Sequence, residues 1–134
     1  EDIQIRSVVD TAMGLECAGI IATNTTIERP EESGVMLETG GLSGAPLRKR
    51  STDVVRLIAD HTDGKWPIIG VGGISTADDA WDKIINGACL VQIYSAMVFK
   101  GASVVKEIVN GLDKKLKLEG LDDLNQAVGL ARRV

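Results

Sequence analysis

Nine consecutive residues decide the fold of this chain: Ile68-Ile69-Gly70-Val71-Gly72-Gly73-Ile74-Ser75-Thr76. An apolar run typical of a buried strand breaks into glycines and hydroxyl residues where a helix is expected to begin. Leu90-Val91-Gln92-Ile93-Tyr94-Ser95 repeats this pattern further along the chain. Such junctions surround an anion with free backbone N–H groups and the positive end of a helix. Two in succession are typical of the phosphate site after the last two strands of a (β/α)₈ barrel.

The apolar periodicity on both sides of this stretch predicts alternating helices and strands. This alternation favours a parallel sheet with right-handed crossovers. An eight-stranded barrel needs about 250 residues, so the 134 residues of this chain correspond to about half of one. Helices are predicted over 5–12, 54–58, 77–84, 105–116 and 121–128, and strands over 20–23, 68–71 and 89–93.

A small, open, doubly wound sheet is the alternative fold for this pattern. That fold would carry its glycine-rich turn after the first strand. Here the first strand runs into Thr23-Asn24-Thr25-Thr26, and the glycines follow the second strand. The order favours an α/β fold that is part of a (β/α)₈ barrel. Helix caps are predicted at Ser51 or Thr52, after an irregular stretch over 24–50, and at Ser75 or Thr76, with Asp78 or Asp79 as the acidic partner.

Composition and charge exclude several classes of function. A net charge of −4 argues against a nucleic-acid partner, because a phosphate backbone requires a basic surface. No apolar run approaches the roughly 20 residues of a membrane span, and the first residues have no signal-peptide character, so we expect a soluble chain. The sequence contains no metal-ligand cluster, no Ser–His–Asp constellation and no paired-carboxylate motif. If a phosphate binds, backbone dipoles rather than a cationic patch are expected to hold it.

Polar side chains at the end of the first strand are candidate ligand contacts. Asn24 and its threonine neighbours offer amide and hydroxyl groups that suit a planar ring bearing amides or imides. The alternative is a turn in which Asn24 and Thr25 cap backbone groups. The glycine cluster 40–44 either wraps a cofactor or forms a surface loop. The junction at Gly73 either binds phosphate or is a tight turn without a ligand. The junction at Tyr94 either binds phosphate or is an ordinary strand end.

Four motifs, in this order and spacing, resemble the C-terminal part of dihydroorotate dehydrogenases. The form Gln92-Ile93-Tyr94-Ser95 is similar to the quinone-using, membrane-associated class 2. The motifs are Ile21-Ala22-Thr23-Asn24-Thr25-Thr26, Thr39-Gly40-Gly41-Leu42-Ser43-Gly44-x-Pro46-Leu47, Pro67-Ile68-Ile69-Gly70-Val71-Gly72-Gly73-Ile74 and Gly87-Ala88-x-Leu90-Val91-Gln92-Ile93-Tyr94-Ser95.

The resemblance implies a (β/α)₈ barrel that carries FMN and oxidises dihydroorotate to orotate in pyrimidine synthesis, with electrons passing to a quinone. Members of class 2 are associated with the bacterial or mitochondrial inner membrane. Carried over by motif, FMN would contact Thr23, Gly44, Gly73, Tyr94 and Ser95, and the pyrimidine and its carboxylate would contact Asn24 and Thr25.

Several parts of the family's machinery match nothing in this chain. Its catalytic serine base, its flavin-contacting lysine, several substrate asparagines and its N-terminal quinone and membrane module all lie upstream of the matched region. Residues 1–134 are therefore expected to form the C-terminal part of the barrel domain, about strands six to eight, with the N-terminal half absent. We expect no catalytic base in the chain and no turnover by the chain alone.

Two other functions remain open at this level. In the first, the chain is a non-catalytic fragment that self-associates through open strand edges and exposed side chains of the barrel interior. Alternatively, it belongs to another FMN-dependent barrel oxidoreductase that acts on a different pyrimidine, although the Thr23-Asn24-Thr25 motif and the motif over 92–95 favour dihydroorotate.

Overall fold

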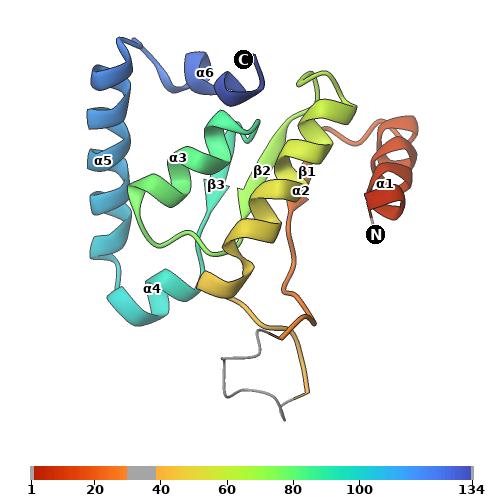
Figure 1. Cartoon of the computed structure of the whole chain (residues 1–134), viewed down its shortest axis with the longest axis horizontal. Helices are drawn as coiled ribbons and strands as arrows, with labels where there is room; N and C mark the ends of the chain where they lie inside the picture. Colours follow the sequence, from red (N-terminus) through yellow and green to blue (C-terminus); the bar gives the residue numbers. More distant parts are fainter. Residues whose placement is uncertain (1, 30–38, 134) are drawn as a thin grey trace.

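A three-stranded parallel sheet forms the centre of the computed structural model, which describes residues 2–29 and 39–133. The strands are β1 (Ile20–Ala22), β2 (Ile68–Val71) and β3 (Leu90–Gln92), and they lie in sequence order. Ile69 of β2 pairs with Ile21 on one side and with Leu90 on the other. All three strands run toward the end of the molecule that carries α4 (Figure 1). This arrangement confirms the predicted strands and their parallel pairing.

The connections between the strands are helical, as the apolar stripes predict. Within the residues that the structure describes, no helix has both the length and the apolar character needed to cross a bilayer. The α-helices are α1 (Asp2–Gly14), α2 (Arg48–His61), α3 (Ala77–Ile85), α4 (Ser95–Lys100), α5 (Ser103–Glu119) and α6 (Leu124–Ala127), with short 3₁₀ turns at Ala45–Leu47 and Leu130–Arg132.

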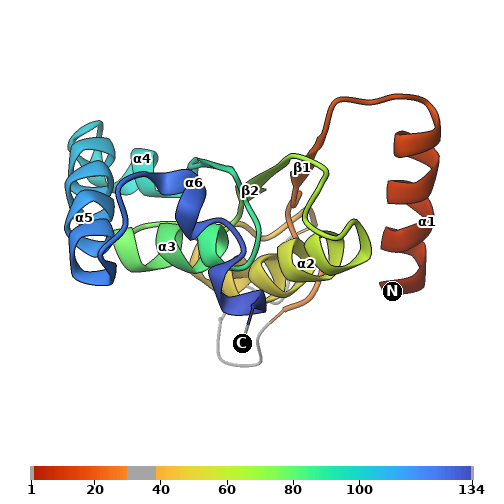
Figure 2. The same cartoon turned by 90° about the horizontal axis from the view of Figure 1, so that it is seen from above.

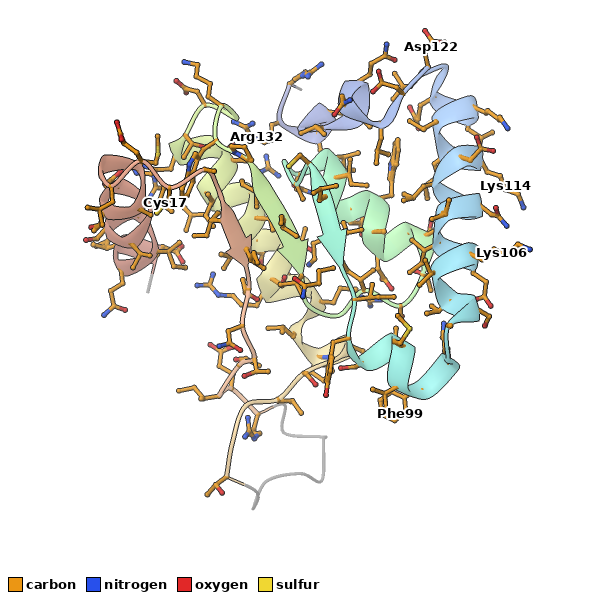
Figure 3. All side chains as sticks on the ribbon, turned by 180° about the vertical axis from the view of Figure 1, so that it is seen from behind. Cys17, Phe99, Lys106, Lys114, Asp122 and Arg132 are labelled. Carbon is orange, nitrogen blue, oxygen red and sulfur yellow. The ribbon has the colours of Figure 1, made fainter. Side chains whose placement is uncertain are left out.

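The helices cover one face of the sheet and leave the other open. Figure 2 shows α2 and α3 on the same side, and Figure 3, viewed from behind, shows the strands in front of these helices. Val55 and Ile58 of α2 pack with Ile68 in one core cluster, and all three are at most 1% exposed. On the open face, Ile21 is 59% and Leu90 is 60% exposed. A doubly wound sheet carries helices on both faces, whereas a barrel wall carries them on one.

The start of α2 differs from the prediction. The helix begins at Arg48, and neither Ser51 nor Thr52 is its N-cap. The Ser51 side chain is fully buried and its hydroxyl donates to the Val71 carbonyl, while Thr52 Oγ1 donates to the Arg48 carbonyl at 3.0 Å. The helix therefore starts without a side-chain cap, directly after the 3₁₀ turn Ala45–Leu47, and Ser51 links it to β2 instead.

The start of α3 follows the predicted capping pattern and selects one of the predicted pairs. Thr76 Oγ1 accepts the N–H of Asp79 at 3.2 Å, and the Asp79 carboxylate accepts the N–H of Thr76 at 3.0 Å. This reciprocal capping box satisfies two of the N–H groups that a helix start leaves free. The predicted helix start at Tyr94-Ser95 is also confirmed, because α4 begins at Ser95.

Candidate functional site

A cleft of about 480 Å³ opens where the three strands end at their carboxyl edge. Its volume lies within the range of about 300–1,000 Å³ that is usual for small-molecule sites. The cleft brings together the ends of all three strands with the segment that precedes α2. Every residue predicted to contact a ligand lines it: Thr23, Asn24, Thr25, Gly44, Gly73, Tyr94 and Ser95.

Thr23 lines this cleft and carries a hydroxyl without a hydrogen-bond partner in the part of the chain that the structure describes. It follows β1 directly, and its backbone N–H donates to the Val71 carbonyl at 2.9 Å, which extends the parallel pairing by one residue. Its side-chain Oγ1 is buried and has no hydrogen-bond partner within the described residues. A buried hydroxyl without a partner costs free energy. Thr23 therefore retains hydrogen-bonding capacity that a bound molecule would satisfy.

Asn24 and Thr25 combine the two roles that their sequence leaves open. The Asn24 side-chain Oδ1 accepts the N–H of Thr25 at 2.8 Å, as the turn interpretation predicts. Both residues also line the cleft. Thr26 pairs with Leu42 through two backbone hydrogen bonds, of 3.0 and 2.7 Å. This bridge holds the glycine segment beside the Asn24 turn.

Gly73 sits where no side chain would fit. Its φ of +70° is unusual for any residue with a Cβ, and an added Cβ would lie 2.4 Å from Arg48 Cβ and 2.5 Å from Arg48 Cα. The loop after β2 is therefore packed directly against the first residue of α2. In the described part of the chain, the Gly73 N–H donates to no acceptor.

Ser95, at the start of α4, lines the same cleft. Its hydroxyl lies 3.0 Å from the Ser43 hydroxyl, and a Cβ added at Gly44 would lie 3.7 Å from Ser95 Cβ. The Ser95 N–H, like that of Gly73, has no acceptor among the described residues. Tyr94, the N-cap residue of α4, is 74% exposed. The junctions after β2 and β3 thus face one shared cleft, as the sequence predicts.

Lys100 is a cleft residue that the sequence analysis missed. Among the described residues that line the cleft, it is the one with a charged side chain. Its Nζ donates to the carbonyl of Ser75 at 2.9 Å, so the ammonium lies beside the loop after β2. Lys100 is the last residue of α4, and no local pattern in the sequence marks that end as part of the cleft. The sequence predicted the start of this helix but not its end.

A family model described as dihydroorotate dehydrogenase matches residues 1–116. The chain belongs to the dihydroorotate dehydrogenase family. It is 46% identical to a protein of Trichodesmium erythraeum named dihydroorotate dehydrogenase (quinone), over 99% of this chain and 38% of that protein. A protein of the same name from Rippkaea orientalis is 47% identical over 97% of this chain and 37% of its own length. These relatives confirm the resemblance to the quinone-dependent class.

Solved dihydroorotate dehydrogenase structures confirm the barrel prediction. The enzyme of Eimeria tenella, crystallised with ferulenol, superposes with a TM-score of 0.93 at 38% identity. The match covers 100% of this chain and 36% of that chain. Its ligand-free form superposes with a TM-score of 0.94. The open, one-sided sheet is therefore a part of a (β/α)₈ barrel, and the doubly wound alternative is wrong.

Proposed function

We propose that this chain supplies part of the FMN and substrate site of a quinone-dependent dihydroorotate dehydrogenase, which oxidises dihydroorotate to orotate in pyrimidine synthesis. The observation that carries this proposal is the shared cleft, which joins all seven predicted contact residues. The chain spans between 37% and 38% of the two curated relatives described above. We assign it to the C-terminal part of the barrel, about strands six to eight, in an enzyme of the inner membrane.

The residues of the cleft suit FMN on chemical grounds. The free N–H groups of Gly73 and Ser95 are donors for a phosphate, and Lys100 adds a positive charge nearby. Thr23, whose buried hydroxyl has no partner among the described residues, lines the cleft and is the proposed contact to the flavin ring. Gly44 and Tyr94 complete the predicted FMN contacts, and Gly44 does so without a Cβ. Held by these residues, FMN would supply a two-electron acceptor for the hydride of dihydroorotate, which a quinone would reoxidise.

Asn24 and Thr25 are the proposed contacts to the pyrimidine. Because the Asn24 Oδ1 already accepts the Thr25 N–H, its side-chain NH₂ is left to donate to a carbonyl or carboxylate of the substrate. The Thr25 hydroxyl adds a second polar group at the same wall. The role of these residues is to orient the ring, so that the reacting carbon faces the flavin.

The chain alone is not expected to turn over dihydroorotate. Among the described residues that line the cleft there is no Asp, Glu, His or Cys, and the serine base of the resembling class matches no position here. General base catalysis requires a group within hydrogen-bond reach of the proton that is removed. Incubation of the purified chain with dihydroorotate and a dye acceptor should give no reduction above the blank. Clear turnover would show that this part of the proposal is wrong.

FMN binding is the direct test of the proposal. Flavin fluorescence and visible absorption titrations of the purified chain should show binding of FMN that is tighter than binding of riboflavin, which lacks the phosphate. Lys100→Gln should weaken FMN binding about two- to fivefold, since an exposed charge pair contributes up to about 1 kcal/mol. Added salt should reduce this difference.

Lys106→Gln provides the matched control for this substitution. Lys106 is exposed on α5, projects away from the sheet and does not line the cleft (Figure 3). This variant should bind both flavins as the unmodified chain does. Equal affinity of the unmodified chain for FMN and riboflavin, or no binding of either, would contradict the proposal.

Self-association is a second candidate property, and the open sheet face favours it. Ile21 and Leu90 lie in one row across the sheet through Ile69, and both are more than half exposed. Contiguous apolar surface of this kind commonly marks an interaction site. We propose that the isolated chain associates with itself through this face.

A further inference from the structure

Three charged side chains support the loop after β2 without lining the cleft. They are Arg48 of α2 and Asp79 and Lys83 of α3, which we call the loop clasp. We propose that the loop clasp positions the loop 72–75 so that the free backbone N–H of Gly73 points toward a bound anion. The inference rests on the proposed function only in taking that anion to be the FMN phosphate.

Asp79 connects the loop to α2. Its Oδ2 accepts the N–H of Ser75 at 2.9 Å and the N–H of Thr76 at 3.0 Å, and its Oδ1 accepts Arg48 Nη1 at 2.7 Å. The residue is 4% exposed. Burial raises the pKa of Asp79, but the hydrogen bonds from Ser75, Arg48 and Thr76 outweigh it and hold the pKa below its ordinary value. The carboxylate is therefore charged at neutral pH and binds the end of the loop.

Lys83 connects α3 to the same end of α2. Its side chain is inaccessible to solvent, and its Nζ donates to the Arg48 carbonyl at 2.9 Å and to Thr52 Oγ1 at 2.6 Å. An ammonium group is costly to bury, and a methionine would fill the same space without that cost. Filling this space does not explain a lysine at position 83. We infer that the lysine fixes the position of the Arg48 backbone.

The position of the Arg48 backbone decides where the loop can lie. Gly73 is packed so closely on Arg48 that an added Cβ would be 2.7 Å from the Arg48 nitrogen. Arg48 is thus held by Asp79 through its guanidinium and by Lys83 through its carbonyl, and its backbone supports Gly73. Donors that are held in place before an anion binds need no reorganisation when it arrives.

The clasp residues act through the loop rather than by contact with a ligand. None of the three lines the cleft, whereas Gly72, Gly73, Ile74 and Ser75 all do. They are therefore positioning residues. Their removal should make the loop more mobile. It should also lower the affinity for FMN without lowering the affinity for riboflavin, which lacks the phosphate.

Amide hydrogen exchange of the chain without ligand tests the positioning directly. Arg48→Met and Asp79→Asn should each speed exchange of the Ser75 and Thr76 N–H groups about tenfold, while exchange in β3 stays the same. Arg48→Lys, which keeps a positive charge, should restore part of the protection. Lys49→Gln is the matched control. Lys49 follows Arg48 on the same helix, and the substitution removes only an exposed ion pair with Asp53. Unchanged loop exchange, or an equal increase throughout the chain, would contradict the proposal.

Binding of two flavins supplies the second readout. The Arg48 and Asp79 variants should lose about tenfold in FMN affinity and keep their riboflavin affinity, whereas a loss of fold would lower both. Lys83→Met, which preserves the buried volume, should show the same selective loss. Variants that retain the full preference for FMN would overturn the inference and leave the proposed function standing. If the unmodified chain binds neither flavin, the proposed function fails, and the exchange rates alone decide whether the clasp positions the loop.

Discussion

Lys83 is a charged residue whose environment changes strongly when the chain folds. It is inaccessible to solvent, and burial lowers its pKa to about 8 from an ordinary 10.5. Charges on Asp79, Asp82 and Asp53 oppose this shift but do not cancel it. The folded chain therefore releases the Lys83 proton at a lower pH than the unfolded chain does. Protonation of this lysine favours unfolding, so its contribution to stability depends on pH.

Stability should accordingly rise with pH between about 8 and 10.5 because of this group. In that window the unfolded chain binds more protons than the folded one, which makes the slope of the unfolding free energy positive. The rise is at most about 1.4 kcal/mol for each pH unit. Urea unfolding at several pH values should show this rise in the unmodified chain and a smaller one in Lys83→Met. Lys106→Met, at an exposed site, should leave the slope unchanged, and equal slopes in all three proteins would contradict the assignment.

At the scale of elements, α3 illustrates a helix whose start is determined locally. Thr76→Ala removes the side-chain acceptor of the capping box and should lower the free energy of unfolding by about 1 kcal/mol. Ser103→Ala is the control, since Ser103 lies in the first turn of α5, does not cap that helix, and makes a long hydrogen bond of 3.4 Å to the Lys100 carbonyl. Its effect should stay within about 0.5 kcal/mol. Denaturant unfolding measures both, and equal losses in the two variants would count against the capping role.

At the scale of the whole molecule, the decisive feature is a sheet with one uncovered face. Size-exclusion chromatography with light scattering should find the purified chain larger than a monomer, because the Ile21 and Leu90 side chains are exposed together. Ile21→Thr combined with Leu90→Thr should shift the chain toward a monomer. Leu118→Thr is the control, because Leu118 is 85% exposed but lies on α5, away from the sheet. A monomeric unmodified chain would rule out self-association.

Local patterns in the sequence were sufficient to predict most of the helices and strands and seven residues that line the cleft. Alternating apolar runs locate β1, β2 and β3, and a Thr76–Asp79 box starts α3. Parallel strands place their carboxyl ends at one edge, so residues that follow each strand meet there without further information. Gly73 and Tyr94 line one cleft for this reason.

Contacts between segments far apart in the chain decided the features that local patterns did not predict, namely the start of α2, the place of Lys100 and the support of the loop after β2. α2 starts at Arg48, whose carbonyl accepts from Lys83, and the predicted cap at Ser51 became a buried link to Val71 instead. Lys100 lies at the cleft through its hydrogen bond to the Ser75 carbonyl, 25 residues earlier in the chain. A sequence pattern reports the preferences of neighbouring residues, since propensity and capping act over a few positions. The support of the anion loop depends on which distant backbone lies against it, and only packing determines that.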